Sequence, residues 1–524
     1  MSRNTKIIYL SYTLLSFMMI SIVLFVITSR LLAYFQVPES LAVELAIDND
    51  ISNFYTPRYE WKSLENEGRE MEEFTLKKIT ADYLASYYYM DLYYFSEKEY
   101  GLKDYQTKKA RAKTMGFVSA HEQQGTKERS TTLDHFFELK MYSDDGTAAV
   151  LTDEQVQYHR IFEGDQLITS YYDTIKYDIM LLLEDNYWRI RHKIRKEVKQ
   201  TELGNFVQAD SVPQVQVVGQ QFRSQGEAFL SKGINYYSAS HPWDEFWDHF
   251  DTTVLKQDLQ LVKDLNLNTI RVFIPYEQFG AQNVEEEYLI KLQQLLDIAD
   301  EKELKVIITL FDFFLSYDVQ HWTKADRHVE AIIRTIGNHP ALFSWDVKNE
   351  PDLDYESQGE TVVNEWLTFI IRRIKTYAPH HLVTIGWSTP EYLRSHSEWV
   401  DYYSFHYYEE ADRLQSYFEE PLDKPVLLEE TGSHSYNSWW YPYRRSNEDQ
   451  AEYLKEILKV IDKNEISFAL WTLYDFKSIP DNVVGKLYWR KGIQKNFGLI
   501  NRRDKEKPAY EVVKSFAGSY QIED

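Results

Sequence analysis

From residue 233 onward, short apolar segments alternate with amphipathic stretches of helical length, and this alternation limits the possible folds more than any other feature of the chain. Eight segments have the length and the β-branched or aromatic content of buried strands. They are GINYY, TIRVFI, KVIITLF, LFSWDV, LVTIGW, DYYSFH, PVLLEE and FALWTLYDF, beginning at residues 233, 269, 305, 342, 382, 401, 425 and 468. Strands separated by helices pair in parallel. The pattern therefore predicts an α/β fold, a (β/α)8 TIM barrel over residues 206–524.

An open, doubly wound parallel sheet would also fit this alternation. Nucleotide-binding sheets of that kind carry a Gly-rich phosphate loop after the first strand. No such loop follows GINYY. The closed barrel is therefore the preferred prediction.

The chain before the barrel predicts a smaller α+β domain over residues 66–205. Apolar residues fall at helical intervals between Glu67 and Phe95, and four segments with strand composition follow. These segments are LDHFFELKMY, TAAVLTDEQVQYHRIF, QLITSYYDTIKYDIMLLL and YWRIRHKIRK. This order resembles the cone-shaped fold of nuclear transport factor 2-like (NTF2-like) domains. No catalytic group of residues stands out here, so a spacer or binding module is expected.

An uncharged run from Ile7 to Ser29 follows Arg3 and Lys6 at the start of the chain. As a helix it would reach about 35 Å, enough to cross a bilayer. Residues 1–30 are therefore predicted to be a transmembrane signal anchor, with residues 31–65 as a linker. The flanking positive charge would keep the N-terminus inside, so a single-pass protein of the cell membrane with an extracellular barrel is expected. A cleaved signal peptide is the alternative.

The charge and the cysteine content exclude several classes of function. The 524 residues carry a formal net charge of -24, which argues against nucleic acid and anionic membrane surfaces as partners. The chain has no cysteine, so it has no disulfides, thiolate metal sites or Cys nucleophile.

Polar residues stand where several of the predicted barrel strands end. In a (β/α)8 barrel the C-terminal ends of the strands surround one shared site. The residues at these ends are Arg271, Asn349, Glu350, His406, Tyr408, Glu430 and Trp471. Two carboxylates facing each other across a barrel mouth can act on one glycosidic bond. We therefore expect the strand in SWDVKNEPD to end at Glu350 and to place this carboxylate in the shared site.

Two of these strands carry a family resemblance. NHPALFSWDVKNEPD and KPVLLEETG resemble the two signature strands of the clan A retaining glycoside hydrolases, nearest to the cellulase- and mannanase-like glycoside hydrolase family 5. The likeness covers roughly residues 220 to 520. It implies that Glu350 is the acid/base and Glu430 the nucleophile, with Asn349 binding the sugar 2-hydroxyl.

The resemblance also implies supporting roles around these carboxylates. Arg271 and Tyr408 would hydrogen-bond the nucleophile and keep it ionised. His406 would line the same subsite, and Trp471 would form the platform under the sugar. Retaining chemistry of this type needs no cofactor and no metal.

The loop after the second signature strand adds two candidates for sugar binding. Trp439 and Trp440 lie in SHSYNSWWYPYRR, where their apolar faces could stack on sugar rings. We include both among the predicted substrate-binding residues.

The sequence departs from the family pattern at three places. Thr431 replaces an aromatic residue, and Glu429 stands beside Glu430, although only one of two neighbours on a strand can point into the mouth. The third strand ends in FDFF, where many relatives have His, so Asp312 is a candidate substitute.

The predicted function is that of a membrane-anchored retaining β-glycoside hydrolase. It would cleave a β-linked poly- or oligosaccharide, of β-1,4-glucan or β-mannan type, by double displacement, with the two carboxyl groups about 5 to 5.5 Å apart. Anchoring at the cell surface would make exopolysaccharide machinery a partner. The alternatives are a non-catalytic glycan-binding or scaffold protein and a transglycosylase.

Overall fold

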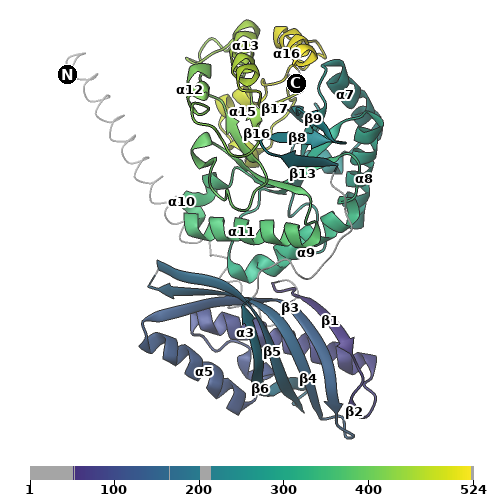
Figure 1. Ribbon diagram of the computed structural model, residues 1–524, viewed down its shortest axis with the longest axis vertical. Helices are drawn as coiled ribbons and strands as arrows, with labels where there is room; N and C mark the ends of the chain where they lie inside the picture. The colour runs from purple at the N-terminus through teal and green to yellow at the C-terminus, as the bar shows by residue number, and fades with distance from the viewer. Residues whose placement is uncertain (1–50, 52–53, 165, 201–213, 521–524) are drawn as a thin grey trace, which may run out of the picture. The chain divides into compact units, whose positions relative to one another are not determined.

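A computed structural model describes residues 51, 54–164, 166–200 and 214–520. Eight parallel strands close into a barrel in the upper part of Figure 1. The first strand pairs with the last, with Lys232 opposite Phe468. The strands are β10 (Lys232–Asn235), β11 (Thr269–Pro275), β12 (Lys305–Asp312), β13 (Leu342–Asn349), β14 (Leu382–Trp387), β15 (Tyr403–Tyr407), β16 (Val426–Thr431) and β17 (Ser467–Leu470). Every predicted segment overlaps one of these strands, so the (β/α)8 barrel is confirmed.

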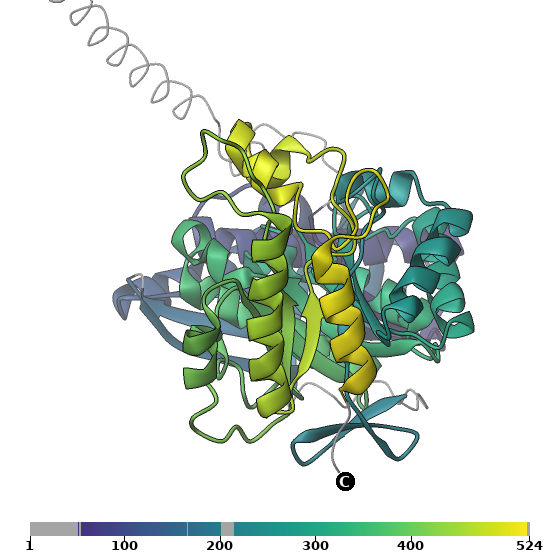
Figure 2. The same ribbon diagram turned by 90° about the horizontal axis from the view of Figure 1, so that it is seen from above.

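Amphipathic helices surround the barrel because each has one apolar face to bury against the strands. They are α7 (Thr252–Asp264), α8 (Glu286–Glu301), α9 (Trp322–Ile336), α11 (Glu360–Tyr377), α12 (Ala411–Ser416), α13 (Asn447–Lys463) and α16 (Pro508–Ser519). Figure 2 shows α13 and α16 side by side. Short helices lie in the connections, namely α6 (Asp244–Asp248), α10 (Tyr355–Gln358), α14 (Asp481–Val484) and α15 (Tyr488–Gln494).

A small antiparallel sheet packs at the end of the barrel where the strands begin. It consists of β7 (Val215–Val218), β8 (Gln221–Ser224) and β9 (Glu227–Phe229). Its Phe222 packs edge-on against Phe343 and Tyr402, with ring centroids 5.2 and 5.0 Å apart. The sheet was not predicted, and it covers the end opposite the predicted site.

Residues before the barrel form helices and a twisted sheet of long strands. The helices are α3 (Glu73–Ser96), α4 (Leu102–Tyr105) and α5 (Lys108–Gln123). The strands are β1 (Arg58–Ser63), β2 (Glu67–Gly68), β3 (Thr126–Tyr142), β4 (Ala148–Glu163), β5 (Gln166–Glu184) and β6 (Tyr187–Gln200). The four predicted strand segments lie in β3 to β6, which pair antiparallel in this order. The NTF2-like resemblance stays a prediction.

The residues predicted as a linker include one strand of this sheet. Arg58–Ser63 pairs in parallel with β3 as strand β1, beginning with Arg58 opposite Asp134. The segment RYEWKS has no buried residue and does not alternate strictly, since Tyr59 and Glu60 are both exposed, so a period-two pattern could not separate it from loop sequence.

The prediction of a single-pass membrane protein is corrected by the structure. Within the ranges that it describes, every helix is too short or too polar to cross a membrane. The long helix α3, for example, carries Glu73, Lys77, Lys78, Asp82 and Asp91. The predicted anchor at residues 1–30 lies outside the described residues, and the predicted cell-membrane location is withdrawn.

Buried ion pairs connect β3 to the helices of the barrel. Arg373 of α11 contacts Asp134 of β3 at 3.1 Å and Asp326 of α9 at 2.7 Å, and all three side chains are 1% exposed. Tyr377 also donates to Asp326 at 2.8 Å. Burial raises the pKa of Asp326, but the Arg373 charge outweighs it, so the pKa lies below its usual value.

Candidate active site

A cavity of about 540 Å³ opens at the C-terminal ends of the barrel strands. Five of the predicted residues line it, and they come from four different strand ends: Asn349, Glu350, Tyr408, Glu430 and Trp471. Arg271 and His406 are fully buried beside them and reach the cavity through their contacts with its carboxylates. Seven of the nine predicted residues are therefore brought together.

Glu350 follows the last residue of β13 in a left-handed backbone conformation, with φ at 47°. A non-glycine residue in this region is strained by about 1 kcal/mol or more. Its N–H donates to the carbonyl of Gly386 at 2.7 Å, and Pro351 begins the next turn. The chain therefore leaves the strand abruptly at Glu350, whose side chain enters the cavity.

A β-bulge decides how Glu429 and Glu430 are placed on β16. In the ladder with β15, Phe405 pairs with Leu428 and His406 pairs with Glu430, so Glu429 is the extra residue. The bulge breaks the strict alternation, and both side chains contact Arg271. Only Glu430 lines the cavity, while Glu429 lies deeper and accepts from Ser404 at 2.8 Å.

Arg271 on β11 organises the charges beneath the cavity. Its guanidinium donates to Glu430 at 2.7 Å and to Asp346 at 2.6 Å, and it lies 3.3 Å from Glu429. It also donates to Asn349 Oδ1 at 3.0 Å, which fixes the orientation of that amide. Burial alone would lower the pKa of Arg271, but the surrounding carboxylates raise it, so this group is a permanent cation.

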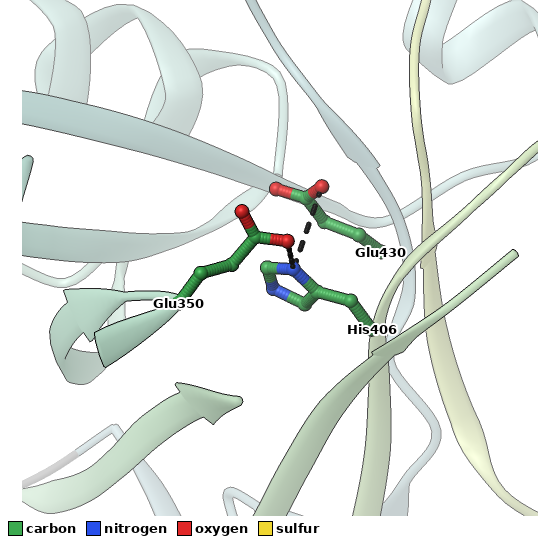
Figure 3. Close-up of side chains that lie close together, drawn as sticks. All are labelled: Glu350, His406 and Glu430. Carbon is green, nitrogen blue, oxygen red and sulfur yellow. Dashed lines mark hydrogen bonds and ion pairs between the residues drawn. The ribbon is translucent and has the colours of Figure 1, made fainter. Parts of the chain in front are cut away.

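His406 of β15 lies between the two carboxylates that face the cavity (Figure 3). Its Nδ1 is 2.9 Å from Glu350 Oε1 and 3.6 Å from Glu430 Oε2. Burial would lower the pKa of His406, but Glu430 and Glu350 raise it above the ordinary value. Burial likewise raises the pKa of Glu350, and His406 more than compensates, so the Glu350 pKa is lowered. These opposite shifts favour a protonated imidazole on His406 beside a charged Glu350 carboxylate.

Tyr408 lies just after β15 and donates to Glu430 Oε2 at 2.7 Å. The other oxygen of Glu430 accepts from Arg271, so both carboxylate oxygens are held. Burial and the Glu430 charge raise the pKa of Tyr408 well above its usual value, and the phenol stays a donor.

Asp312 ends β12 and also lines the cavity. Its Oδ2 lies 3.5 Å from the hydroxyl of Tyr237. Burial raises the pKa of Asp312 to about 6, although Lys348 and Arg271 counteract this shift. The cavity therefore contains a third acid that changes charge near neutral pH.

Trp471 follows β17 and lines the cavity beside Trp243 and Tyr237. Its ring centroid is 5.8 Å from that of Trp243 and 6.3 Å from that of Tyr237. Its indole Nε1 is buried without a hydrogen-bond partner among the described residues. An apolar ring face with one unsatisfied donor suits a sugar, which offers C–H faces and hydroxyl acceptors.

Trp439 and Trp440 do not line the cavity. They are 87% and 42% exposed on the loop after β16, and Trp440 lies 6.4 Å from the ring of Tyr488. From the same loop, His434, Tyr443 and Arg445 line the cavity instead. The predicted contact of both tryptophans with substrate stays untested, and it could occur only outside this cavity.

Sequence reasoning missed several residues of the lining. Tyr237 lies two residues after β10, so the strand-end rule would have found it. Phe497 follows α15, far from any strand end, and contacts Tyr408 at a centroid distance of 5.9 Å. No local pattern marks such a residue, because only the path of the long loop brings it to the cavity.

Among the described residues, Glu350, His406 and Glu430 form one group whose ligand atoms could hold a metal ion. These atoms lie within 4.8 Å of one another. The imidazolium already supplies a positive charge between the two carboxylates. The prediction that the chemistry needs no metal or cofactor stays a prediction.

Curated relatives match part of the chain at low identity. Human β-glucuronidase is 24% identical over 302 residues, which are 53% of this chain and 43% of that protein. Mannan endo-1,4-beta-mannosidase A of Hypocrea jecorina is 23% identical over 201 residues, or 33% of this chain and 46% of that protein. The chain thus spans less than half the length of these relatives.

Among solved structures, an exo-beta-1,4-mannosidase from an Opitutaceae bacterium matches with a TM-score of 0.48 and 21% identity, covering 57% of this chain and 61% of that one. A family model described as Cellulase (glycosyl hydrolase family 5) matches residues 224–477, which include all eight barrel strands, β10 to β17, and every predicted site residue. Residues 224–477, slightly less than half of the chain, are therefore similar to the cellulase family, glycosyl hydrolase family 5.

Proposed function

We propose that the barrel is a retaining β-glycoside hydrolase. The observation that carries the proposal is the pair Glu350 and Glu430, whose carboxylate oxygens approach within 4.8 Å across the cavity. Retaining enzymes hold their carboxyl groups about 5–5.5 Å apart, whereas inverting enzymes leave about 6.5–9.5 Å for a water molecule. This separation is closer to the retaining arrangement and favours direct attack by one carboxylate.

In the first step Glu430 attacks the anomeric carbon, and the bond to the leaving oxygen breaks. Arg271 and Tyr408 hold the two Glu430 oxygens and leave a lone pair free for attack. The leaving oxygen takes a proton from Glu350. The product is a glycosyl ester of Glu430.

The proton for this step comes from the pair of His406 and Glu350. The Glu430 charge is one of the causes that raise the His406 pKa. Ester formation removes that charge, so the imidazolium becomes a stronger acid as the attack proceeds. It then passes its proton to Glu350, which delivers it to the leaving oxygen.

In the second step Glu350 accepts a proton from water, which attacks the anomeric carbon and releases Glu430. Two inversions at this carbon leave the β configuration unchanged. A sugar hydroxyl in place of water would give transglycosylation through the same intermediate.

A β-1,4-glucan or β-mannan is the proposed substrate class. The relative from Hypocrea jecorina is named for a mannan, and the other relatives are named for β-glucuronides. The platform of Trp471 and Trp243 suits the flat face of a β-linked pyranose. Exopolysaccharide machinery is not part of this proposal, because that partner followed from the predicted membrane anchor.

The test is hydrolysis of β-glucans, β-mannans and an aryl β-glucuronide by the full chain and by Glu350→Gln and Glu430→Gln. We expect turnover of one substrate class, lost in both variants, with a first product of β configuration in an NMR time course. A first product of α configuration would contradict retention. Binding of a glycan without turnover by the unmutated chain would favour the non-catalytic glycan-binding protein.

Azide assigns the two roles separately. In Glu430→Ala, azide can occupy the place of the missing carboxylate and attack the anomeric carbon from the face opposite the leaving group. An α-glycosyl azide is therefore expected. In Glu350→Ala, azide should intercept the ester at Glu430 and give a β-glycosyl azide. Exchanged product configurations would exchange the two roles.

Trp440→Ala tests whether the loop aromatics bind a longer substrate. We expect KM for a polymer to rise about 3- to 10-fold, since one stacked ring contributes roughly 0.5–1.5 kcal/mol. The kcat/KM for a small aryl glycoside should stay unchanged, because Trp440 lies outside the cavity lining. An equal loss on both substrates would contradict a role restricted to outer sugar units.

A further inference from the structure

A second cavity, of about 480 Å³, lies between the helices α3 and α5 and the strands β3 to β6. It shares no lining residue with the cavity of the barrel. Pockets for small molecules are usually about 300–1,000 Å³. The volume is therefore large enough for a ligand of one or two rings.

The lining of this cavity is unusually cationic for the chain. Four Lys or Arg residues (Lys113, Arg191, Lys193 and Arg195) face three acids (Asp91, Glu128 and Asp173). The chain as a whole has a net charge of -24. An excess of positive charge in one cavity of an acidic protein favours an anionic occupant.

Lys193 is placed in the cavity by a β-bulge in β6. Leu181 pairs with Ile190 and Met180 pairs with His192, which leaves Arg191 as the extra residue. The extra residue shifts the alternation of side chains between the two faces of the sheet. Lys193 thereby points toward α3. Its ammonium lies 4.3 Å from the ring centroid of Tyr87 and 4.1 Å from that of Tyr177.

The Lys193 ammonium has no carboxylate partner within ion-pair distance among the described residues. Burial lowers the pKa of Lys193 to about 8, so the half-buried group is still mostly charged at pH 7. The two tyrosine rings stabilise a cation without neutralising it. An ammonium held in this way can receive an anionic ligand group.

Two of the three acids of the cavity, Asp91 and Glu128, have other partners. Asp91 accepts from Ser130 at 3.2 Å, and burial raises the pKa of Asp91 well above its usual value. Glu128 lies 2.7 Å from His159 and 3.5 Å from His121. Neither acid forms an ion pair with Lys193.

The remaining lining combines ring-sized apolar surface with amides. Met90, Tyr94, Phe117 and Tyr171 contribute the apolar surface, and Gln106 and Gln157 contribute the amides. We propose that this cavity binds a small organic acid, a six-membered ring that bears a carboxylate, with the carboxylate on Lys193 and the ring against the tyrosines. The proposal is independent of the reaction in the barrel.

Calorimetry on the full chain tests the proposal with two matched pairs of probes. D-glucuronate against D-glucose represents a sugar acid, and benzoate against benzamide represents an aromatic acid. We expect saturable binding of at least one acid, with its neutral counterpart at least tenfold weaker. The acid that binds identifies the kind of ring. No saturable binding of either acid, or equal binding of the neutral partner, would overturn the proposal in favour of a cavity filled by water.

Variants locate the binding. Lys193→Met should weaken binding of the acid at least tenfold, and Lys193→Arg should retain it. Lys196→Met is the matched control, because Lys196 lies on the same strand, is 53% exposed and pairs with Asp178. Unchanged circular dichroism of each variant shows that it is folded. Undiminished binding by a folded Lys193→Met would overturn the proposal, and loss of binding in Glu430→Gln would move the ligand to the barrel and overturn it as well.

Discussion

At the scale of single residues, the neighbours Glu429 and Glu430 have different chemistry because they lie at different depths. Glu430 reaches the cavity and is held by Arg271 and Tyr408. Burial raises the pKa of Glu429 to about 7, with Arg271 counteracting it. A buried acid that is partly protonated at neutral pH supports the charge of Arg271 but cannot reach a substrate.

Substituting each glutamate by glutamine separates these roles. Glu430→Gln should lower kcat at least about a thousandfold, because an amide is not a nucleophile. Glu429→Gln should lower it by less than about tenfold, since the amide resembles the protonated acid and can still accept from Ser404. Initial rates on the substrate identified above measure both. The reverse order of losses would assign the nucleophile to Glu429.

Asp312 couples the active site to stability through its raised pKa. The ordinary value of 3.8 becomes about 6 in the folded protein. The folded state then holds this proton more tightly than the unfolded state. Stability is therefore lost as pH rises from about 4 to about 6, by roughly 3 kcal/mol for this group alone.

Asp312→Asn should remove this loss. We expect the variant to gain about 2–3 kcal/mol of unfolding free energy over the unmutated protein at pH 7.5 but little at pH 4. Urea denaturation of both proteins at the two pH values measures the difference between their unfolding free energies. The other titrating groups are the same in both proteins, so their contributions cancel in this difference. A gain of equal size at both pH values would mean that ionisation of Asp312 is not its source.

At the scale of elements, the buried ion pairs of Arg373 connect three separate elements, namely β3, α9 and α11. Each partner is 1% exposed, so its charge is removed from water. Such pairs contribute little over an apolar contact, but loss of one partner leaves the others uncompensated. The Arg373 guanidinium is thus needed for stability as long as Asp134 and Asp326 are buried beside it.

Arg373→Met should lower the free energy of unfolding by about 3–5 kcal/mol, because it removes the fully buried cation between Asp134 and Asp326 and leaves them only the less buried Arg58 and Arg327. Arg334→Met on α9 is the matched control, since Arg334 is 61% exposed in its pair with Glu330 and such pairs are worth about 0–1 kcal/mol. Chemical denaturation compares the two. Losses of similar size would show that burial of the Arg373 network adds nothing.

At the scale of the whole described molecule, the proposed chemistry lies at one end of the barrel and a packed sheet closes the other. The strand C-termini surround the cavity with Glu350 and Glu430, and the sheet of β7 to β9 covers the other end. A change at the β7 to β9 end is therefore expected to alter stability without altering the chemistry at the other end.

Phe222→Ala tests this separation. Removal of a buried aromatic ring typically costs about 3–5 kcal/mol, and Phe222 is 3% exposed between Phe343 and Tyr402. We expect that loss in thermal or chemical denaturation, with kcat and KM unchanged below the melting range. Val218→Ala, at a 54% exposed position of the same sheet, should be nearly neutral. A fall in kcat for Phe222→Ala would show that the two ends are coupled.

The sequence by itself determined the barrel and the strand ends that carry its polar residues. Apolar period and segment length are local properties, and parallel strands of one barrel all end on the same face. The family resemblance assigned Glu430 to the site, but only tertiary structure showed how Glu429 and Glu430 are placed, because a bulge depends on the register with β15. Tertiary structure also decided that Phe497 and Tyr443 line the cavity while Trp439 and Trp440 do not. Loop residues follow the path of the folded chain, and no short pattern encodes that path.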